Sequence, residues 1–211
     1  MTNFSNSYHS NYFKSINEGI INTIYSLNRV KSEPELFFIT IKETLNVILK
    51  KRSKIFFFGN GASAAFANHM ALDFSKNGKI LTRALSDSAL LTALANDYSY
   101  ENAILEFLKI EKVTRDDLII TISSSGNSLN IVNVLNYCKE NGIKSLAFSG
   151  LKNDNKSISL ADYSVHVPMK TYGIVECVHQ IFLHLILDDF MEILEWERND
   201  FQNMNASNFK L

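Results

Sequence analysis

The sequence predicts an α/β fold built as a three-layer αβα sandwich, with a five-stranded parallel sheet between two layers of helices. Five short apolar segments alternate along the chain with segments whose apolar residues recur at helical spacing, the pattern of repeated strand–helix units. The strand segments, such as KIFFF and IITI, are also too apolar to leave one face of a sheet in contact with water. Two further helices are predicted ahead of the first strand.

Composition narrows the functional classes before any motif is considered. The 211 residues suit one domain with extensions, and 46% of them are hydrophobic, enough for a sizeable core. Lys and Arg number 21 against 22 Asp and Glu, so the net charge of −1 gives no general attraction to nucleic acid or to an anionic membrane. The two cysteines indicate neither a disulfide framework nor a CxxC zinc motif. We expect a cytoplasmic protein, because the polar N-terminus lacks a signal-peptide core and the most apolar late segment carries too many polar groups to span a membrane.

The first 52 residues are predicted to form two helices. Apolar residues between Ser7 and Val30 recur at i, i+3, i+4 and i+7, as on an amphipathic helix. Pro34 stands at the start of a second helical segment that runs to about Lys51, a position that proline tolerates. The apolar faces of both helices need covering, either by a partner subunit or by the domain's own sheet. We expect residues 1–52 to be a helical extension that serves oligomerisation.

The rest of the chain divides into the predicted α/β domain, residues 53–196, and a loose polar tail, residues 197–211. The expected strands are Lys54–Phe58, Lys79–Leu85, Asp117–Ile122, Ile143–Phe148 and Tyr163–Val167. The expected helices of this domain are Ser63–Lys76, Tyr100–Glu111, Leu129–Asn141, a turn or short helix at Ser157–Leu160, and a long last helix at Gly173–Glu195.

The segment Ile119–Ser128, IITISSSGNS, is the most informative part of the sequence for function. A buried strand runs directly into a hydroxyl-rich turn, and a helix follows. This order places backbone N–H groups and serine hydroxyls at a helix N-terminus, where the helix dipole favours an anion, and Gly126 allows a backbone conformation that a side chain resists. A phosphate-binding turn is the functional interpretation. An ordinary capped helix after a strand is the alternative, because Ser and Asn are favoured there in any case.

A second polar turn, GNGAS, follows the first predicted strand. The carboxyl ends of parallel strands meet at one edge of a sheet, where ligands of doubly wound folds bind. Both turns are therefore expected at the same ligand-binding edge.

Two predicted helices carry residues at spacings that suit a metal site. On an ideal helix, His69 and Asp73 are separated by roughly 40°, and Glu176 and His184 by roughly 80°. His179 lies about 140° from His184 by the same arithmetic, so both cannot face one ion. Two histidines and two carboxylates suit zinc or a similar divalent ion. The alternative is that His184 is a hydrogen-bonded core histidine and Asp73 a solvated helix residue.

Taken together, the motifs resemble those of the sugar isomerase (SIS) domain family, and within it those of the phosphoheptose isomerases. The resemblance extends over roughly residues 50–190 and keeps the order of the motifs. The matching segments are GNGAS at Gly59–Ser63, H-x3-D at His69–Asp73, SD at Ser86-Asp87, AND at Ala95–Asp97, DLIITISSSGNS at Asp117–Ser128, and the Val-Pro, Glu and His positions from Val167 to His184. The resemblance implies a flavodoxin-like strand order.

The resemblance also implies a role for each matching position. The phosphate of a phosphorylated sugar is held by Ser123, Ser124, Ser125 and Ser128. The sugar is contacted by Asn60, Gly61, Ala62, Ser63, Asn96 and Asp97, and also by Asp73 and Glu176. A Zn²⁺ ion is bound by His69, Asp73, Glu176 and His184. Asp73 acts as the catalytic base and His184 as the acid, and helices of neighbouring subunits in a homotetramer complete each site.

Three positions depart from the usual pattern of the family. Ala62 replaces a glycine, Asp73 replaces a glutamate, and Glu176 replaces a glutamine. A shorter base and an extra negative charge both alter a site for proton transfer. Two alternatives to isomerisation of sedoheptulose 7-phosphate follow from these changes: a non-catalytic protein that senses a phosphosugar or binds a partner, and an isomerase of another phosphosugar in surface polysaccharide synthesis.

Overall fold

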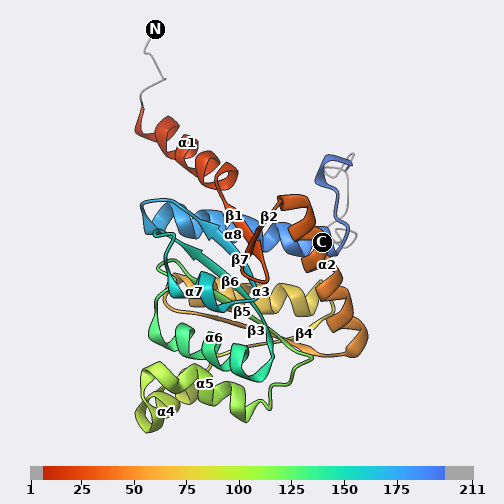
Figure 1. The fold of residues 1–211 in the computed structure, drawn as a ribbon, viewed down its shortest axis with the longest axis vertical. Coiled ribbons are helices and arrows are strands. Elements are labelled where there is room, and N and C mark those ends of the chain that lie inside the picture. The colour runs from red at the N-terminus through yellow and green to blue at the C-terminus, as the bar shows by residue number, and fades with distance from the viewer. Residues whose placement is uncertain (1–6, 198–211) are drawn as a thin grey trace, which may run out of the picture.

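The computed structural model describes residues 7–197, which form three layers with the sheet in the middle (Figure 1). The chain order of helices and strands alternates as expected for an α/β fold. The helices are α1 (Tyr8–Ile21), α2 (Pro34–Lys51), α3 (Ala62–Lys76), α4 (Ser88–Tyr98), α5 (Tyr100–Ile110), α6 (Leu129–Asn141), α7 (Lys156–Leu160) and α8 (Tyr172–Phe190), with a 3₁₀ turn η2 at Glu195–Glu197.

The sheet has seven strands in the order β2-β1-β7-β6-β5-β3-β4. The five strands from β3 to β7 pair in parallel, whereas β1 pairs antiparallel with β7 and β2 antiparallel with β1. The strands are β1 (Ile24–Leu27), β2 (Val30–Ser32), β3 (Lys54–Gly59), β4 (Leu81–Ala84), β5 (Leu118–Ser123), β6 (Lys144–Gly150) and β7 (Tyr163–Val167).

The prediction of a five-stranded sheet behind a purely helical extension was wrong, because residues 24–32 form a hairpin that adds two strands to the sheet. The predicted first helix ends at Ile21. The hairpin turn, Asn28-Arg29, has φ angles of 49° and 67°, and two left-handed residues are what a two-residue hairpin turn requires. The Arg29 guanidinium holds the turn in place, since it donates to the Leu160 carbonyl and lies 3.2 Å from Asp162 Oδ1.

Alternate side chains of the strands enter two separate cores, one on each face of the sheet. Phe57 packs with its ring 5.3 Å from that of Phe74 in α3, on the face covered by α1, α2, α3 and α8. Phe58 contacts Phe107 of α5 on the opposite face, which α4 to α7 cover. Figure 1 shows α8 and the group of α4, α5 and α6 on opposite sides of the sheet. The burial of both faces places any ligand site at the sheet's edges or between helices.

The predicted last helix was too long. Helix α8 ends at Phe190, and Glu192 then adopts a left-handed φ of 58° that a continuing helix does not allow. Apart from Glu197, the predicted polar tail of residues 197–211 lies outside the described residues.

Buried His166 on β7 supports the loop beside the serine-rich turn. Its Nε2 donates to Asn153 Oδ1 at 2.8 Å, and its Nδ1 lies 3.0 Å from the Ser149 hydroxyl. Burial lowers the pKa of His166 from 6.5 to about 4, because a charged imidazole loses its hydration there.

This shift predicts a stability that depends on pH. Between pH 6.5 and 4 the unfolded chain takes up a proton at His166 that the folded protein resists, so the free energy of unfolding falls as the pH falls through this range. From pH 7 to pH 5 we expect His166 to contribute a loss of about 2 kcal/mol. Urea unfolding at the two pH values, in the wild type and in His166→Gln, measures this contribution as the difference between the two losses. Equal losses in the two proteins would contradict the prediction.

Candidate functional site

The serine-rich turn lies at the carboxyl end of β5, a central strand, and leads into α6. Ser123 and Ser124 are each only 5% exposed, and Gly126 at the apex has a left-handed φ of 63°. The Gly126 N–H closes the turn by donating to the Ser123 carbonyl at 2.8 Å. Strand, turn and helix therefore occur in the order that the sequence predicted.

The turn offers hydrogen-bond donors that the protein itself does not use. Ser128 is the N-cap of α6, but its side chain does not cap the helix, and the N–H groups of Leu129 and Asn130 at the start of α6 have no acceptor within the described residues. The Ser124 hydroxyl is buried and has no hydrogen-bond partner among the described residues. Unused N–H groups at a helix N-terminus, together with an unpartnered buried hydroxyl, suit an anion such as phosphate.

Hydrogen bonds from helix α7 and from the end of strand β6 hold this turn in place. The Gly126 carbonyl accepts hydrogen bonds from the Ser157 backbone and from its hydroxyl, at 3.0 and 2.9 Å. The Ser124 carbonyl accepts from the Gly150 N–H at 3.0 Å. Carbonyl groups of the turn are thus occupied within the protein, while the donors described above are left for a ligand.

The GNGAS turn at the carboxyl end of β3 begins α3. Gly61, the N-cap of α3, has a left-handed φ of 56°; Gly61 and Ala62 are exposed, whereas Ser63 is buried. Asn60 lines a cavity of about 140 Å³ together with Tyr100 and Asn130. Because β3 is the neighbour of β5 in the sheet, both polar turns lie at the same edge, as predicted.

Asn96 and Asp97 occupy the last turn of α4, and both are exposed. Their side chains bond to each other, with Asn96 Nδ2 donating to Asp97 Oδ1 at 3.0 Å. They do not line the cavity beside Asn60.

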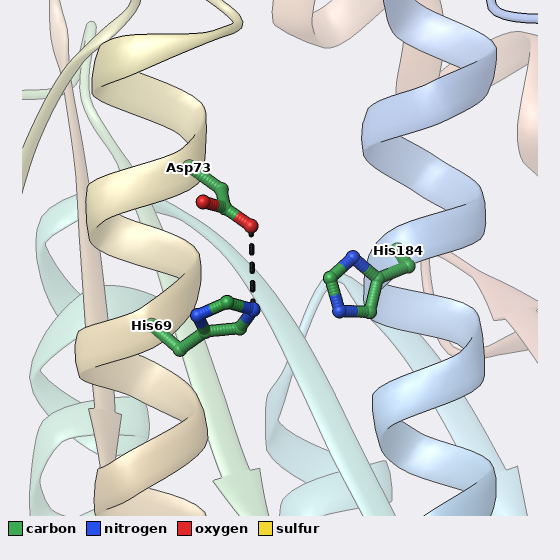
Figure 2. A group of neighbouring side chains, drawn as sticks. All are labelled: His69, Asp73 and His184. Carbon is green, nitrogen blue, oxygen red and sulfur yellow. Dashed lines mark ion pairs between the residues drawn. The ribbon is translucent and has the colours of Figure 1, made fainter. Parts of the chain in front are cut away.

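The predicted metal-binding residues His69, Asp73 and His184 come together from two helices, α3 and α8 (Figure 2). His69 Nε2 lies 3.3 Å from Asp73 Oδ2, and the imidazole rings of His69 and His184 are 5.3 Å apart. One potential ligand atom from each of the three residues lies within 4.8 Å of the other two. Two imidazoles and a carboxylate match the three protein ligands of many catalytic zinc sites, which keep a further position open for water or substrate.

Glu176, the fourth predicted ligand, does not belong to this cluster. The side chain of α8 that reaches His184 is Gln180, whose Nε2 lies 2.8 Å from His184 Nε2. Gln180 is one turn before His184, the same four-residue spacing that joins His69 to Asp73. That spacing is present in the sequence, but glutamine is not a typical metal ligand and Gln180 was missed.

His184 and Gln180 also line a large, mainly apolar groove of about 1490 Å³ between α2 and α8. His179, by contrast, is completely buried and its Nε2 donates to the Ser149 carbonyl, as a core histidine. The structure therefore separates His184, which faces an open space, from His179, which does not.

The fold and the site define a doubly wound α/β protein with a rigid, donor-rich turn at the carboxyl edge of its parallel strands. Such proteins bind anionic ligands at this edge. The same chain carries a cluster of two histidines and a carboxylate. In the described part of the chain, no helix is long and apolar enough to cross a membrane.

Comparisons with known proteins identify the family. The sequence pattern of the SIS domain matches residues 24–150, more than half of the chain. The phosphoheptose isomerase of Thermodesulfovibrio yellowstonii is 34% identical over 163 residues, which cover 73% of this chain and 80% of that protein. The chain belongs to the SIS domain family.

Solved structures show the same fold. A phosphoheptose isomerase from Francisella tularensis aligns with a TM-score of 0.73 and 20% identity, covering 91% of this chain and 99% of the other. The phosphoheptose isomerase of Neisseria gonorrhoeae aligns with a TM-score of 0.69 and 22% identity, covering 86% and 94% of the two chains. At these identities the likeness concerns the fold.

Proposed function

We propose that the protein is a phosphoheptose isomerase, which interconverts sedoheptulose 7-phosphate and D-glycero-D-manno-heptose 7-phosphate. The observation that carries this proposal is the meeting of His69, Asp73 and His184 on two helices of a SIS domain. The named relatives and the donor-rich turn after β5 support it. An aldose–ketose isomerase needs acid–base groups near one end of the sugar and an anion-binding site for the other end.

In this proposal the serine-rich turn binds the phosphate and holds the open-chain sugar in place. Hydroxyls of Ser123, Ser124, Ser125 and Ser128 and the first N–H groups of α6 supply the contacts, while Asn60 to Ser63, Asn96 and Asp97 line the sugar. Binding energy from the remote phosphate orients the reacting carbons.

Asp73 and His184 move the protons. The Asp73 carboxylate takes a proton from C1 of the ketose, and the C1–H electron pair forms a C1–C2 double bond while charge moves to the oxygen on C2. His184 protonates that oxygen and takes the proton of the C1 hydroxyl. Asp73 then returns its proton to C2, which gives the aldehyde at C1 without net loss or gain of atoms.

A divalent ion, for which zinc is the best match, would be held by His69, Asp73 and His184. When bound, it stabilises negative charge on a substrate oxygen. The cluster of His69, Asp73 and His184 forms without Glu176. In this proposal Glu176, on α8, therefore contacts the sugar and does not bind the metal.

The direct test is to incubate the purified protein with sedoheptulose 7-phosphate and to follow the aldose by NMR. Appearance of the aldose in the wild type supports the proposal. Binding of the sugar phosphate with no conversion would overturn it and favour the non-catalytic sensor, and conversion of a different ketose phosphate alone would assign another substrate.

Metal binding gives a separate prediction. We expect dialysis of the metal-stripped protein against ZnCl₂ to load about one ion for each chain, and His69→Ala to lower the affinity at least tenfold, because one of three ligands is lost. His9→Ala is the matched control, since His9 lies on α1 outside the cluster. Equal zinc binding by His69→Ala and His9→Ala would contradict this site.

We also propose that the protein is a cytoplasmic homotetramer. Apolar side chains of α2 and α8 stay exposed in the single chain, among them Leu36, Ile39, Ile181 and Leu185. Burial of such a patch between subunits removes apolar surface from water. Light scattering on the eluted protein is expected to give four times the chain mass of 23.9 kDa, and the mass of a monomer would exclude the assembly.

A further inference from the structure

Gln180 of α8 bonds to one of the two ring nitrogens of His184. Its Nε2 lies 2.8 Å from His184 Nε2 and 3.7 Å from the sulfur of Met70 on α3. Its Oε1 is buried and has no hydrogen-bond partner among residues 7–197. The amide of Gln180 is therefore enclosed between α3 and α8, and the bond to His184 is its one strong hydrogen bond within the described residues.

The Met70 sulfur decides which atom of the amide faces His184. A thioether sulfur accepts hydrogen bonds weakly and has no hydrogen to donate. The atom of Gln180 that lies against both the sulfur and the imidazole is therefore the nitrogen, since its two hydrogens serve one acceptor each. An oxygen at the same position would face the sulfur without any bond to it.

A donor at Nε2 determines the tautomer of His184. A neutral imidazole that accepts at Nε2 carries its hydrogen at Nδ1. Nδ1 is also the ring nitrogen that Gln180 leaves free. Figure 2 shows the His184 ring on the side of α8 that faces His69 and Asp73 of α3. Nδ1 is therefore the nitrogen that His184 offers to the cluster, where it presents an N–H donor.

We propose that Gln180 is a positioning residue, which occupies Nε2 of His184 and makes Nδ1 the nitrogen that acts in the site. This inference rests on the proposed isomerase function, in which His184 is the acid. Nδ1 then gives its hydrogen to the oxygen on C2 and takes the hydrogen of the C1 hydroxyl, so one nitrogen serves both transfers. The other tautomer would present a lone pair, and no hydrogen, to the oxygen that gains negative charge.

An amide suits this task better than a carboxylate or an apolar side chain. In the role of a metal ligand, His184 Nδ1 must be free of hydrogen, and the ring hydrogen then lies on Nε2. Gln180 can hold this form as well, because a turned amide accepts from Nε2–H through Oε1, which has no other partner within residues 7–197. A carboxylate at this position could accept but not donate, and an apolar side chain could do neither.

The tautomer of His184 is the direct test, and it needs neither substrate nor metal. Two-bond ¹H–¹⁵N NMR of the metal-stripped protein at about pH 9, where histidine is neutral, shows which ring nitrogen carries the hydrogen, and His184→Gln identifies the signal. We expect Nδ1–H in the wild type and Nε2–H in Gln180→Glu, whose carboxylate only accepts. A wild type with its hydrogen at Nε2, or the same tautomer in both proteins, would overturn the proposal.

Asn68→Asp is the matched control. This substitution also replaces an amide by a carboxylate, on α3 one residue before His69, but Asn68 lines the cavity beside Asn60, which does not include His184. Its added charge is expected to leave the hydrogen of His184 on Nδ1. A change of tautomer as large as that in Gln180→Glu would assign the effect to charge alone and refute the role of Gln180.

Kinetics measure what the positioning contributes. Gln180→Leu neither donates nor accepts, and we expect its kcat for sedoheptulose 7-phosphate to fall about 10- to 100-fold, the usual effect of losing the partner that orients a metal-binding histidine. KM is expected to change little, because the serine-rich turn is untouched. Wild-type kcat in Gln180→Leu would overturn the proposal. A wild type that shows Nδ1–H and does not isomerise the sugar would overturn the isomerase function and still support the assignment of Nδ1.

Discussion

Asp73→Asn is expected to lower kcat for sedoheptulose 7-phosphate by about 10²- to 10⁴-fold, the contribution of a positioned general base. Asparagine has almost the same size and shape, but its amide does not take a proton from carbon. The Asp73 carboxylate is also the acidic member of the cluster with His69 and His184, so the amide weakens metal binding in addition. Steady-state NMR rates at saturating substrate measure the effect.

Asp116→Asn is the control for this experiment. Asp116 pairs with Lys51 on the surface, just before β5 and at the opposite end of the parallel strands from the two polar turns. Loss of an exposed ion pair is expected to change stability by less than about 1 kcal/mol, and kcat is expected to stay near its wild-type value. If Asp73→Asn were as active as Asp116→Asn, Asp73 would not be the base.

Gly126→Ala is expected to abolish the ordered serine turn, and with it most of the affinity for a sugar phosphate. Gly126 has a left-handed φ of 63°, and an added Cβ would collide with the side chain of Asn155. Asn155 is 2% exposed and caps α7 by accepting from Ile158 N–H, so it cannot move aside without breaking that cap. The collision is expected to lower the free energy of unfolding by about 1–3 kcal/mol, in addition to the cost of placing an alanine in the left-handed conformation. Calorimetry is expected to show at least a tenfold weaker binding of sedoheptulose 7-phosphate.

Gly142→Ala separates the collision from the strain of a left-handed alanine. Gly142 is the C-cap of α6, the helix that follows the serine-rich turn, and its φ of 67° is close to that of Gly126. A Cβ there would meet Arg115 atoms at 3.6 Å or more, an ordinary contact. The variant is expected to lose about 1 kcal/mol and to bind the sugar phosphate normally. Equal affinity of both variants for the sugar phosphate would show that the turn is not the phosphate-binding site.

Local features of the site were predictable from the sequence because they depend on neighbouring residues. The order of strand, serine turn and helix around Ile119–Ser128 follows from one continuous segment. The pairing of His69 with Asp73 follows from four-residue spacing on a helix. Glu176 is eight residues from His184, and this looser spacing does not bring it into the cluster.

Features that depend on distant contacts were missed. Ile20, Ile24 and Leu27 suit both a helical period and a short strand, and the hairpin is stabilised by pairing with β7 more than 130 residues later. Its turn lacks the Asn-Gly signal. Arg29 stands where that signal has glycine, and its side chain donates to the Leu160 carbonyl at the end of α7. The bonds of Asn60 to Tyr100 and Asn130 likewise join segments 40 and 70 residues away.

A crystal soaked with sedoheptulose 7-phosphate tests the central claim most directly. We expect the phosphate group against the Ser123–Ser128 turn and the N-terminus of α6, with C1 and C2 of the open-chain sugar within reach of Asp73 and His184. A phosphate group bound elsewhere, or reacting carbons remote from both side chains, would contradict this account of the protein.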